Sequence, residues 1–298
     1  MASVAKLLGE RPGAIAVRCY TGDSFAYRCP AVASPPNSPA GMRGRPITFQ
    51  LIESMKRAQH IDHLLGTWKF DPATLSVRMV KGKDGRDVVQ MRVDMGVLQM
   101  ETTGRPDGSQ PEGFESYLEY LTNRDLEEDT ITLTESECNE VDREFMQFYH
   151  RRICWLRLQY YRRAVMDADH TLALMDLSSK SSPDEEWTTS HEQYRPFVLF
   201  HRTQAESLAE LEENGAEEAV QAINAGLEAI HHVFIDHEVE EHYESDELVV
   251  RLTELRESMR REYAVGRTLK ERLEEAVENE KYELAAELRD ELARREVG

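Results

Sequence analysis

Hydrophobic positions at helical spacing occupy the C-terminal end of the chain in two short runs. The first extends from Leu269 to Val277 and the second from Tyr282 to Leu292. Apolar residues at i, i+3, i+4 and i+7 predict amphipathic helices. Asn279-Glu280-Lys281 lies between the runs. The pattern therefore predicts a helical hairpin, in which the small side chains of Ala285 and Ala286 let the two helices approach closely.

Longer helical runs fill the middle of the chain. Thr134-Glu135-Ser136-Glu137 has the pattern of a capping box, which predicts that a long helix begins there. A pair of helices is predicted from Phe197 to Glu213 and from Ala216 to Phe234, with Gly215 as the turn. One further helix is predicted from Val239 to Tyr263.

The pattern changes to a period of two ahead of these helices. Residues 75–79 and 89–95 alternate between apolar and polar side chains, and Lys81-Gly82-Lys83-Asp84-Gly85 has turn chemistry. This predicts a β-hairpin. The apolar parity slips at Gly96, which predicts a bulge. A two-stranded ribbon needs cover for its apolar face, which either the helix predicted from Ile47 to Leu65 or further strands would supply.

Together these elements predict an α+β fold, predominantly α, in four parts. The stretch from Ala31 to Gly41 is rich in Pro, Ser, Ala and Gly without periodicity, and the chain up to residue 46 is predicted to be disordered. Met42 or Met55 is accordingly an alternative start of the working protein. The four parts are the disordered segment (1–46), a small α/β domain containing the β-hairpin (47–123), a helical domain (134–264) and the helical hairpin (266–298).

The hairpin resembles a known family motif. Tyr282 to Asp290 reads aromatic-Glu-x-Ala-Ala-x-Leu-Arg-Asp after a leucine-spaced first helix. This resembles the UVR motif of the excision-repair proteins UvrB and UvrC, of Clp-type ATPases and of bacterial protein arginine kinase activators. The resemblance covers about a tenth of the chain. It implies protein–protein docking rather than catalysis, because so short a hairpin needs further packing to be stable.

A docking surface and a class of partner follow from this resemblance. The partner would carry a matching hairpin, and the two would pack as a four-helix unit. UvrB or UvrC is the first candidate, which implies nucleotide excision repair; a Clp-type ATPase or a protein-kinase circuit is the alternative, and self-association stays open. Tyr282 is expected to cover the closed end of the hairpin, and Arg289 and Asp290 to fix the register. The implied contact residues are Leu273, Val277, Tyr282, Ala285, Ala286, Leu288, Arg289, Asp290 and Leu292.

The middle helices resemble tetratricopeptide (TPR) repeats. The resemblance is imperfect, because Arg151 and Arg152 stand at positions that are usually apolar or small. A generic helical bundle is the alternative. Ala219 in the second pair stands where Ala164 stands in the first. The interlocking positions of the first pair are Phe148, Trp155, Leu158, Tyr161, Ala164, Val165, Ala168 and Leu172.

Charge and hydropathy narrow the choice of partners. The formal net charge of the 298 residues is −20. An acidic surface repels a phosphate backbone, so direct nucleic-acid binding is not expected. No apolar run reaches the length of a membrane span, and the N-terminus lacks the pattern of a signal peptide. We therefore expect a cytoplasmic protein without membrane contact.

Patterns for cofactor or metal chemistry are missing from the sequence. It has no Gly-rich phosphate loop, so the ATPase activity of UvrB is not carried over. Its four cysteines form no CxxC pair, unlike those of the arginine kinase activators. His237 and His242 are five residues apart and diverge by about 140° on a helix. We therefore expect no cofactor, no metal, no catalytic residue and no enzymatic activity, with Cys154 as a core residue.

The loop Gly104-Arg105-Pro106-Asp107-Gly108 is a second candidate site of a different class. It is expected to expose Arg105 and Asp107, which would make the N-terminal domain a small-ligand binder or an unrecognised enzyme. A plain surface turn is the alternative. Perturbed carboxylates in a deep pocket beside the loop would favour the enzyme, whereas an open surface would favour the adaptor.

Overall fold

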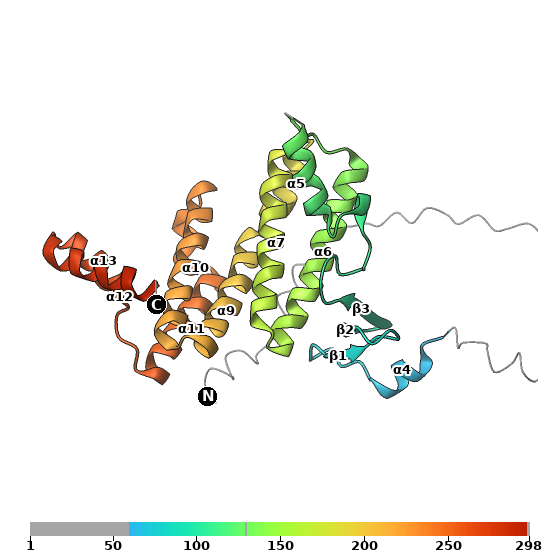
Figure 1. The fold of residues 1–298 in the computed structure, drawn as a ribbon, viewed down its shortest axis with the longest axis horizontal. Coiled ribbons are helices and arrows are strands. Elements are labelled where there is room, and N and C mark those ends of the chain that lie inside the picture. Colours follow the sequence, from blue (N-terminus) through green and yellow to red (C-terminus); the bar gives the residue numbers. More distant parts are fainter. Residues whose placement is uncertain (1–59, 129, 297–298) are drawn as a thin grey trace, which may run out of the picture. The chain divides into compact units, whose positions relative to one another are not determined.

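The computed structural model describes residues 60–128 and 130–296 and shows helices with one small antiparallel sheet (Figure 1). The prediction of an α+β, predominantly α, fold is thereby confirmed. The segment predicted to be disordered and the helix predicted from Ile47 fall outside the described residues, except for the end of that helix. The described chain divides into two compact units, one of residues 77–91 and 99–296 and one of residues 60–76 and 92–98.

Ten helices of the described residues set the fold, two of them short 3-10 helices. They are α4 (Asp62–Thr67), η2 (Pro111–Gly113), α5 (Tyr117–Glu127), α6 (Glu135–Leu158), α7 (Tyr161–Lys180), α8 (Glu185–Glu192), α9 (Arg195–Glu213), α10 (Ala216–Asp236), η3 (Glu240–Ser245) and α11 (Glu247–Tyr263), and the C-terminal hairpin of α12 (Leu269–Glu278) and α13 (Tyr282–Glu296) follows them.

The sheet contains the predicted β-hairpin and one more strand. Strands β1 (Val77–Lys81), β2 (Asp87–Val93) and β3 (Gly96–Glu101) lie in the order β1-β2-β3. Strands β1 and β2 are antiparallel, and their register pairs Val77 with Met91 and Lys81 with Asp87. The alternation of apolar residues therefore gave both strands and the turn between them.

The bulge predicted at Gly96 is wrong. Asp94 and Met95 form a two-residue turn, and Gly96 begins strand β3. When a hairpin turn has two residues, odd-numbered residues of one strand pair with even-numbered residues of the next. A two-residue turn therefore shifts the parity of the apolar positions, just as a bulge does. The amide of Gln90 donates a hydrogen bond to Gln99 (3.0 Å), as this pairing requires.

Arg92 organises the smaller unit from within. Its side chain is buried, and its guanidinium donates to the backbone oxygens of Trp68 (2.7 Å), Asp94 (3.0 Å) and Gly96 (2.8 Å). The indole N–H of Trp68 donates in turn to the Ser76 hydroxyl (2.6 Å). One charged group thus supplies hydrogen-bond donors to three backbone carbonyls.

The capping box predicted at the start of α6 is confirmed. The Thr134 hydroxyl accepts from the Glu137 backbone N–H, and the Glu137 carboxylate accepts from the Thr134 backbone N–H. The single helix predicted from Val239 is wrong in its first part. The chain forms η3 there, and the Asp246 carboxylate then caps α11 by accepting from the Leu248 and Val249 N–H groups. Asp246 is thus both the C-cap of η3 and the N-cap of α11.

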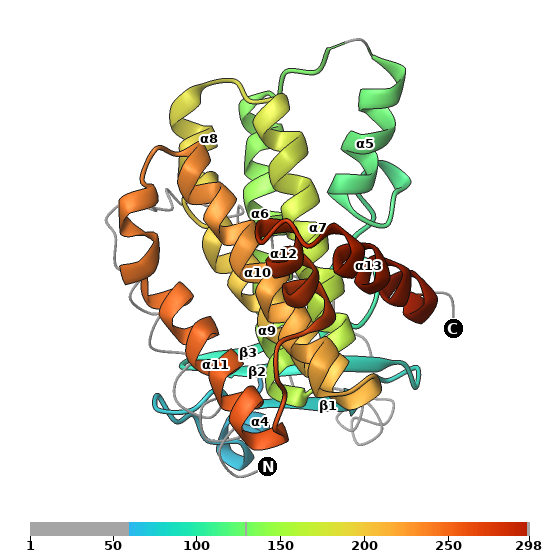
Figure 2. The same ribbon diagram turned by 90° about the vertical axis from the view of Figure 1, so that its left-hand side faces the viewer.

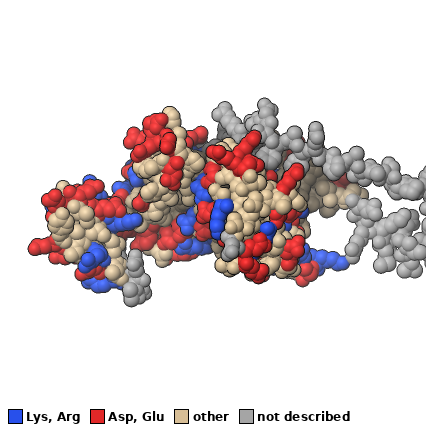
Figure 3. All heavy atoms as spheres, turned by 90° about the horizontal axis from the view of Figure 1, so that it is seen from above, with Lys and Arg blue, Asp and Glu red and all other residues tan. Residues whose placement is uncertain are grey.

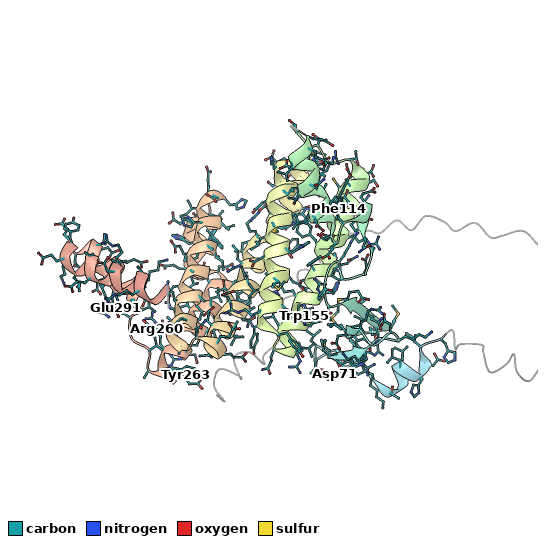
Figure 4. The ribbon with its side chains drawn as sticks, viewed as in Figure 1. Asp71, Phe114, Trp155, Arg260, Tyr263 and Glu291 are labelled. Carbon is teal, nitrogen blue, oxygen red and sulfur yellow. The ribbon has the colours of Figure 1, made fainter. Side chains whose placement is uncertain are left out.

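Consecutive long helices pack against one another, α6 on α7, α7 on α9, α9 on α10 and α10 on α11. Trp155 is fully buried among them (Figure 4). Of the residues predicted to interlock, Leu158 and Leu172 are half-buried, and the rest are buried. The TPR resemblance itself stays a prediction. The buried members are Phe148, Trp155, Tyr161, Ala164, Val165 and Ala168, with Ala219 in the second pair.

Helices α9 and α10 approach most closely where Gly226 faces Thr203. A Cβ atom added to Gly226 would lie 1.9 Å from the Thr203 hydroxyl oxygen and 2.6 Å from its Cβ. Both distances are far inside van der Waals contact, so only glycine fits this crossing.

We expect Gly226→Ala to destabilise the chain by about 1–3 kcal/mol, because overpacking forces backbone shifts in a close-packed interior. The free energy of unfolding in urea measures this effect. Gly266→Ala is the matched control, since a Cβ there meets nothing within 4 Å. Thr203→Ala should restore part of the loss in the double variant. Equal unfolding midpoints for the two glycine variants would contradict the expectation.

Candidate functional site

The C-terminal hairpin has the two helices and the turn that the sequence predicts (Figure 2). Helix α12 begins with a capping box, in which the Thr268 hydroxyl accepts from the Glu271 N–H and the Glu271 carboxylate accepts from the Thr268 N–H (2.8 Å). Glu280 in the turn has a φ of 56°, and the Lys281 N–H donates to the Ala276 carbonyl (2.7 Å). These bonds close the hairpin tightly.

The hairpin has a small apolar core of its own. Leu269, Ala276, Ala285 and Leu288 are 3–8% exposed and pack together, and the half-buried Leu273 and Leu292 lie against them. Four of the predicted docking residues, Leu273, Ala285, Leu288 and Leu292, therefore hold α12 and α13 to each other. Substituting them would test the fold of the hairpin rather than its binding.

Other predicted docking residues face outward. Val277 is 51% exposed, Tyr282 is 67% exposed, and Ala286 is exposed. Arg289 and Asp290 are exposed too and pair with each other (2.8 Å). The hairpin thus presents apolar and charged groups together. Figure 3 shows charged residues beside uncharged ones at its left end.

The expectation that Tyr282 covers the closed end of the hairpin is wrong. The buried line of α13 runs through Ala285, Leu288 and Leu292. At about 100° per residue, Tyr282 lies about 60° from Ala285 and about 120° from Leu288, on the side away from that line. Ala286 and Arg289 lie on the same side as Tyr282. Leu284, which is 41% exposed, lies on the opposite side of the buried line.

Polar contacts join the hairpin to α10 and α11. The Glu271 carboxylate accepts hydrogen bonds from Asn224 of α10 (3.0 Å) and from Arg260 of α11, which is labelled in Figure 4. The Thr268 hydroxyl donates to Gln221 (2.9 Å). Burial would raise the pKa of Glu271, but the Thr268 N–H, Arg260 and Asn224 hold it below its usual value. Glu271 therefore stays ionised and both caps α12 and anchors it.

The local sequence predicts only part of this anchor. Thr268-Leu269-Lys270-Glu271 is itself a capping-box pattern and announces the helix start. Nothing local shows, however, that Glu271 also meets Asn224 and Arg260, because these partners lie 47 and 11 residues away.

Comparison with known families agrees with this geometry. The model of the UvrB/uvrC motif, UVR, matches residues 267–296, which are α12, α13 and the capping segment before them. The UVR motif is a protein-interaction module. No curated protein and no solved structure matches the chain. Among the described residues, no helix combines the length and the apolar character that crossing a membrane requires.

The loop at Gly104–Gly108 does not expose Arg105, contrary to expectation. Arg105 is 3% exposed and pairs with Glu140 (2.8 Å) and Glu144 (3.4 Å) on α6. The Asp107 carboxylate accepts from the Ser109 hydroxyl and backbone N–H and from two α6 side chains, Arg143 and Gln147. Both loop residues thus contact their own chain, although a ligand role for them stays a prediction.

Glu144 lies at the centre of this charged cluster. It is fully buried and accepts from the Tyr117 N–H (2.7 Å) and the Leu118 N–H (3.0 Å) at the start of α5, while His170 lies 2.8 Å away. Burial would raise the pKa of Glu144, but His170 and the two backbone N–H groups hold it below its usual value. The carboxylate therefore joins α5, α6 and α7.

The remaining candidates for chemistry are protected or spread out. Burial raises the pKa of the Cys154 thiol to about 12 and that of Cys138 to about 11, so both stay protonated at neutral pH. His237 and His242 are exposed. Within residues 60–128 and 130–296, no three His, Cys, Asp or Glu side chains gather in a way that could hold a metal ion.

We expect Glu144→Gln to destabilise the chain by about 1–3 kcal/mol at pH 7, because a buried ionic acceptor is lost. The folded-state pKa of Glu144 is lowered, so its contribution is present above the unfolded value of about 4.3 and disappears as pH falls through the folded value. The difference in unfolding free energy should therefore shrink below about pH 4.3. The exposed Glu254→Gln serves as the control, and a difference constant from pH 7 to 3 would contradict the assignment.

Proposed function

We propose that this protein is a cytoplasmic, non-enzymatic adaptor that docks through its UVR hairpin onto a partner carrying a similar hairpin. The observation that supports this most is the pair of exposed apolar side chains, Val277 and Tyr282, on a segment that matches an interaction motif. Exposed large apolar groups on a small module are typical of protein contact surfaces. Tyrosine in particular is enriched where interfaces gain most of their energy.

The proposed interface is one side of the hairpin rather than the whole of it. Leu269, Ala276, Ala285 and Leu288 are occupied within the hairpin, so the partner meets Val277, Tyr282 and Ala286. The small Ala286 side chain permits close approach of a partner helix, and the Arg289–Asp290 pair beside it can exchange partners across the interface. Two hairpins packed in this way would form a four-helix unit.

UvrB and UvrC are the first candidate partners, which places the proposed role in nucleotide excision repair. The support is the motif match, since this hairpin type takes its name from those two proteins. The net charge of −20 favours contact with the repair proteins rather than with DNA itself. A Clp-type ATPase or a protein-kinase circuit would use the same surface and is the alternative outcome of the test below.

We expect Val277→Ala/Tyr282→Ala to weaken binding to the partner at least tenfold, because it removes the exposed apolar contacts and leaves the hairpin core intact. Full-length chains carrying a purification tag capture partners from the native cell extract, and mass spectrometry compares UvrB, UvrC and Clp ATPases between variants. Leu284→Ala is the matched control. Leu284 is also an exposed apolar residue, but it lies on the opposite side of α13.

The result distinguishes the candidate functions. Loss of UvrB or UvrC with the double variant and retention with Leu284→Ala would support the repair adaptor. Loss of a Clp ATPase alone would transfer the proposal to that circuit. Identical partner sets for all three chains would overturn docking through this surface. Circular dichroism of each variant checks that α12 and α13 remain folded.

A further inference from the structure

A polar hollow lies beside the hairpin, between α12 and the main helical body. It is lined by Gln221, Asn224, Ala225 and Glu228 of α10, Arg256 of α11, and Lys270, Glu271 and Glu274 of α12.

The hollow continues the proposed docking surface. Lys270, Glu274 and Val277 are spaced i, i+4 and i+7, so they lie on one face of α12. The first two line the hollow, and Val277 is exposed just beyond it, next to the turn that leads to Tyr282. A partner helix that covers Val277 and runs along this face therefore reaches Glu274 and then α10.

Part of the hollow is already occupied by internal hydrogen bonds. Arg256 donates to Asn224 (3.0 Å) and to Glu257 (3.1 Å), and Asn224 donates to Glu271 (3.0 Å). Glu271 also accepts from Arg260. These hydrogen bonds form a network on one side of the hollow, in which each side chain is held by a neighbour. Arg256 pairs with Glu257 and Glu271 pairs with Arg260, so these charges are already balanced within the chain.

The remaining charges favour a cation. Glu228 and Glu274 are exposed carboxylates, and the ammonium of Lys270 lies 3.9 Å from the Glu228 carboxylate. The side chains of both are about half exposed or more, so this pair is weak. Two carboxylates against one ammonium leave a negative balance, on a protein whose net charge is already −20.

We propose that the partner bound at the hairpin also enters this hollow with a lysine or arginine side chain, which pairs with Glu228 and Glu274. This inference rests on the proposed function and adds a condition to it. The interface is composite, because α10 contributes a residue outside the matched motif. The hollow then selects among proteins that share the UVR hairpin, since a partner with an acidic group at that position is repelled.

Charge reversal in the full-length chain tests the proposal. Purified UvrB and UvrC are the probes, and their Kd is measured at low and high salt. Glu228→Lys/Glu274→Lys should raise the Kd about tenfold at low salt, with a smaller effect at high salt because screening weakens exposed pairs. Asp236→Lys/Glu254→Lys is the matched control. It changes the net charge equally, on exposed residues outside the hollow, and should change the Kd less than twofold.

The outcomes distinguish this proposal from the function it rests on. Equal Kd values for the two charge-reversed chains would overturn the hollow as a contact, while sensitivity to Val277→Ala/Tyr282→Ala would leave hairpin docking in place. Hairpin docking and the hollow contact would both be overturned if the unaltered chain bound neither probe and if Val277→Ala/Tyr282→Ala captured the same proteins from the extract as the unaltered chain.

Discussion

The limited apolar content of the hairpin determines how it can be used. Six side chains of α12 and α13 pack between the two helices, and four of them are almost completely buried. Helices this short are marginal on their own, so their stability depends on that contact. The remaining large side chains, Val277, Tyr282 and Leu284, stay outside because the buried line of each helix is too narrow to include them. The same constraint thus gives the hairpin its fold and leaves apolar side chains exposed on its surface.

The connection between the hairpin and the body is of a different kind. The apolar core of the hairpin shares no side chain with the large core around Ile223 and Leu252. Glu271, Thr268 and their partners Gln221, Asn224 and Arg260 supply directional hydrogen bonds instead. Hydrogen bonds fix orientation but contribute only about 0.5–1.5 kcal/mol each between neutral groups and about 1.5–3 kcal/mol each to a charged group. The hairpin is therefore positioned by polar contacts while its apolar outer residues remain available.

The sequence predicted what depends on local patterns and missed what depends on distant partners. Helical periodicity and capping boxes located α6, α9, α10, α12 and α13, because both signals lie within the helix itself. The parity shift at Gly96 has two local explanations, a bulge and a two-residue turn, and the local pattern does not distinguish them. The exposure expected of Arg105 failed because Glu140 and Glu144 lie 35 and 39 residues later, and no turn rule reveals them. The direction of Tyr282 required knowing that Ala285 and Leu288 form the buried line.

Arg151 gives a physical reason for the departure from the TPR pattern. Its buried guanidinium forms two bonds with Asp167 (2.7 and 2.9 Å) and donates to the carbonyls of Glu101 (3.1 Å) and Gly104 (2.7 Å). An apolar residue at this position would leave the buried Asp167 charge without its partner, at a cost of several kcal/mol. The arginine thus ties the end of β3 to α6 and α7. Arg151 therefore departs from the repeat pattern because it links the helices to the strand. A repeat without such a strand has no need of this contact.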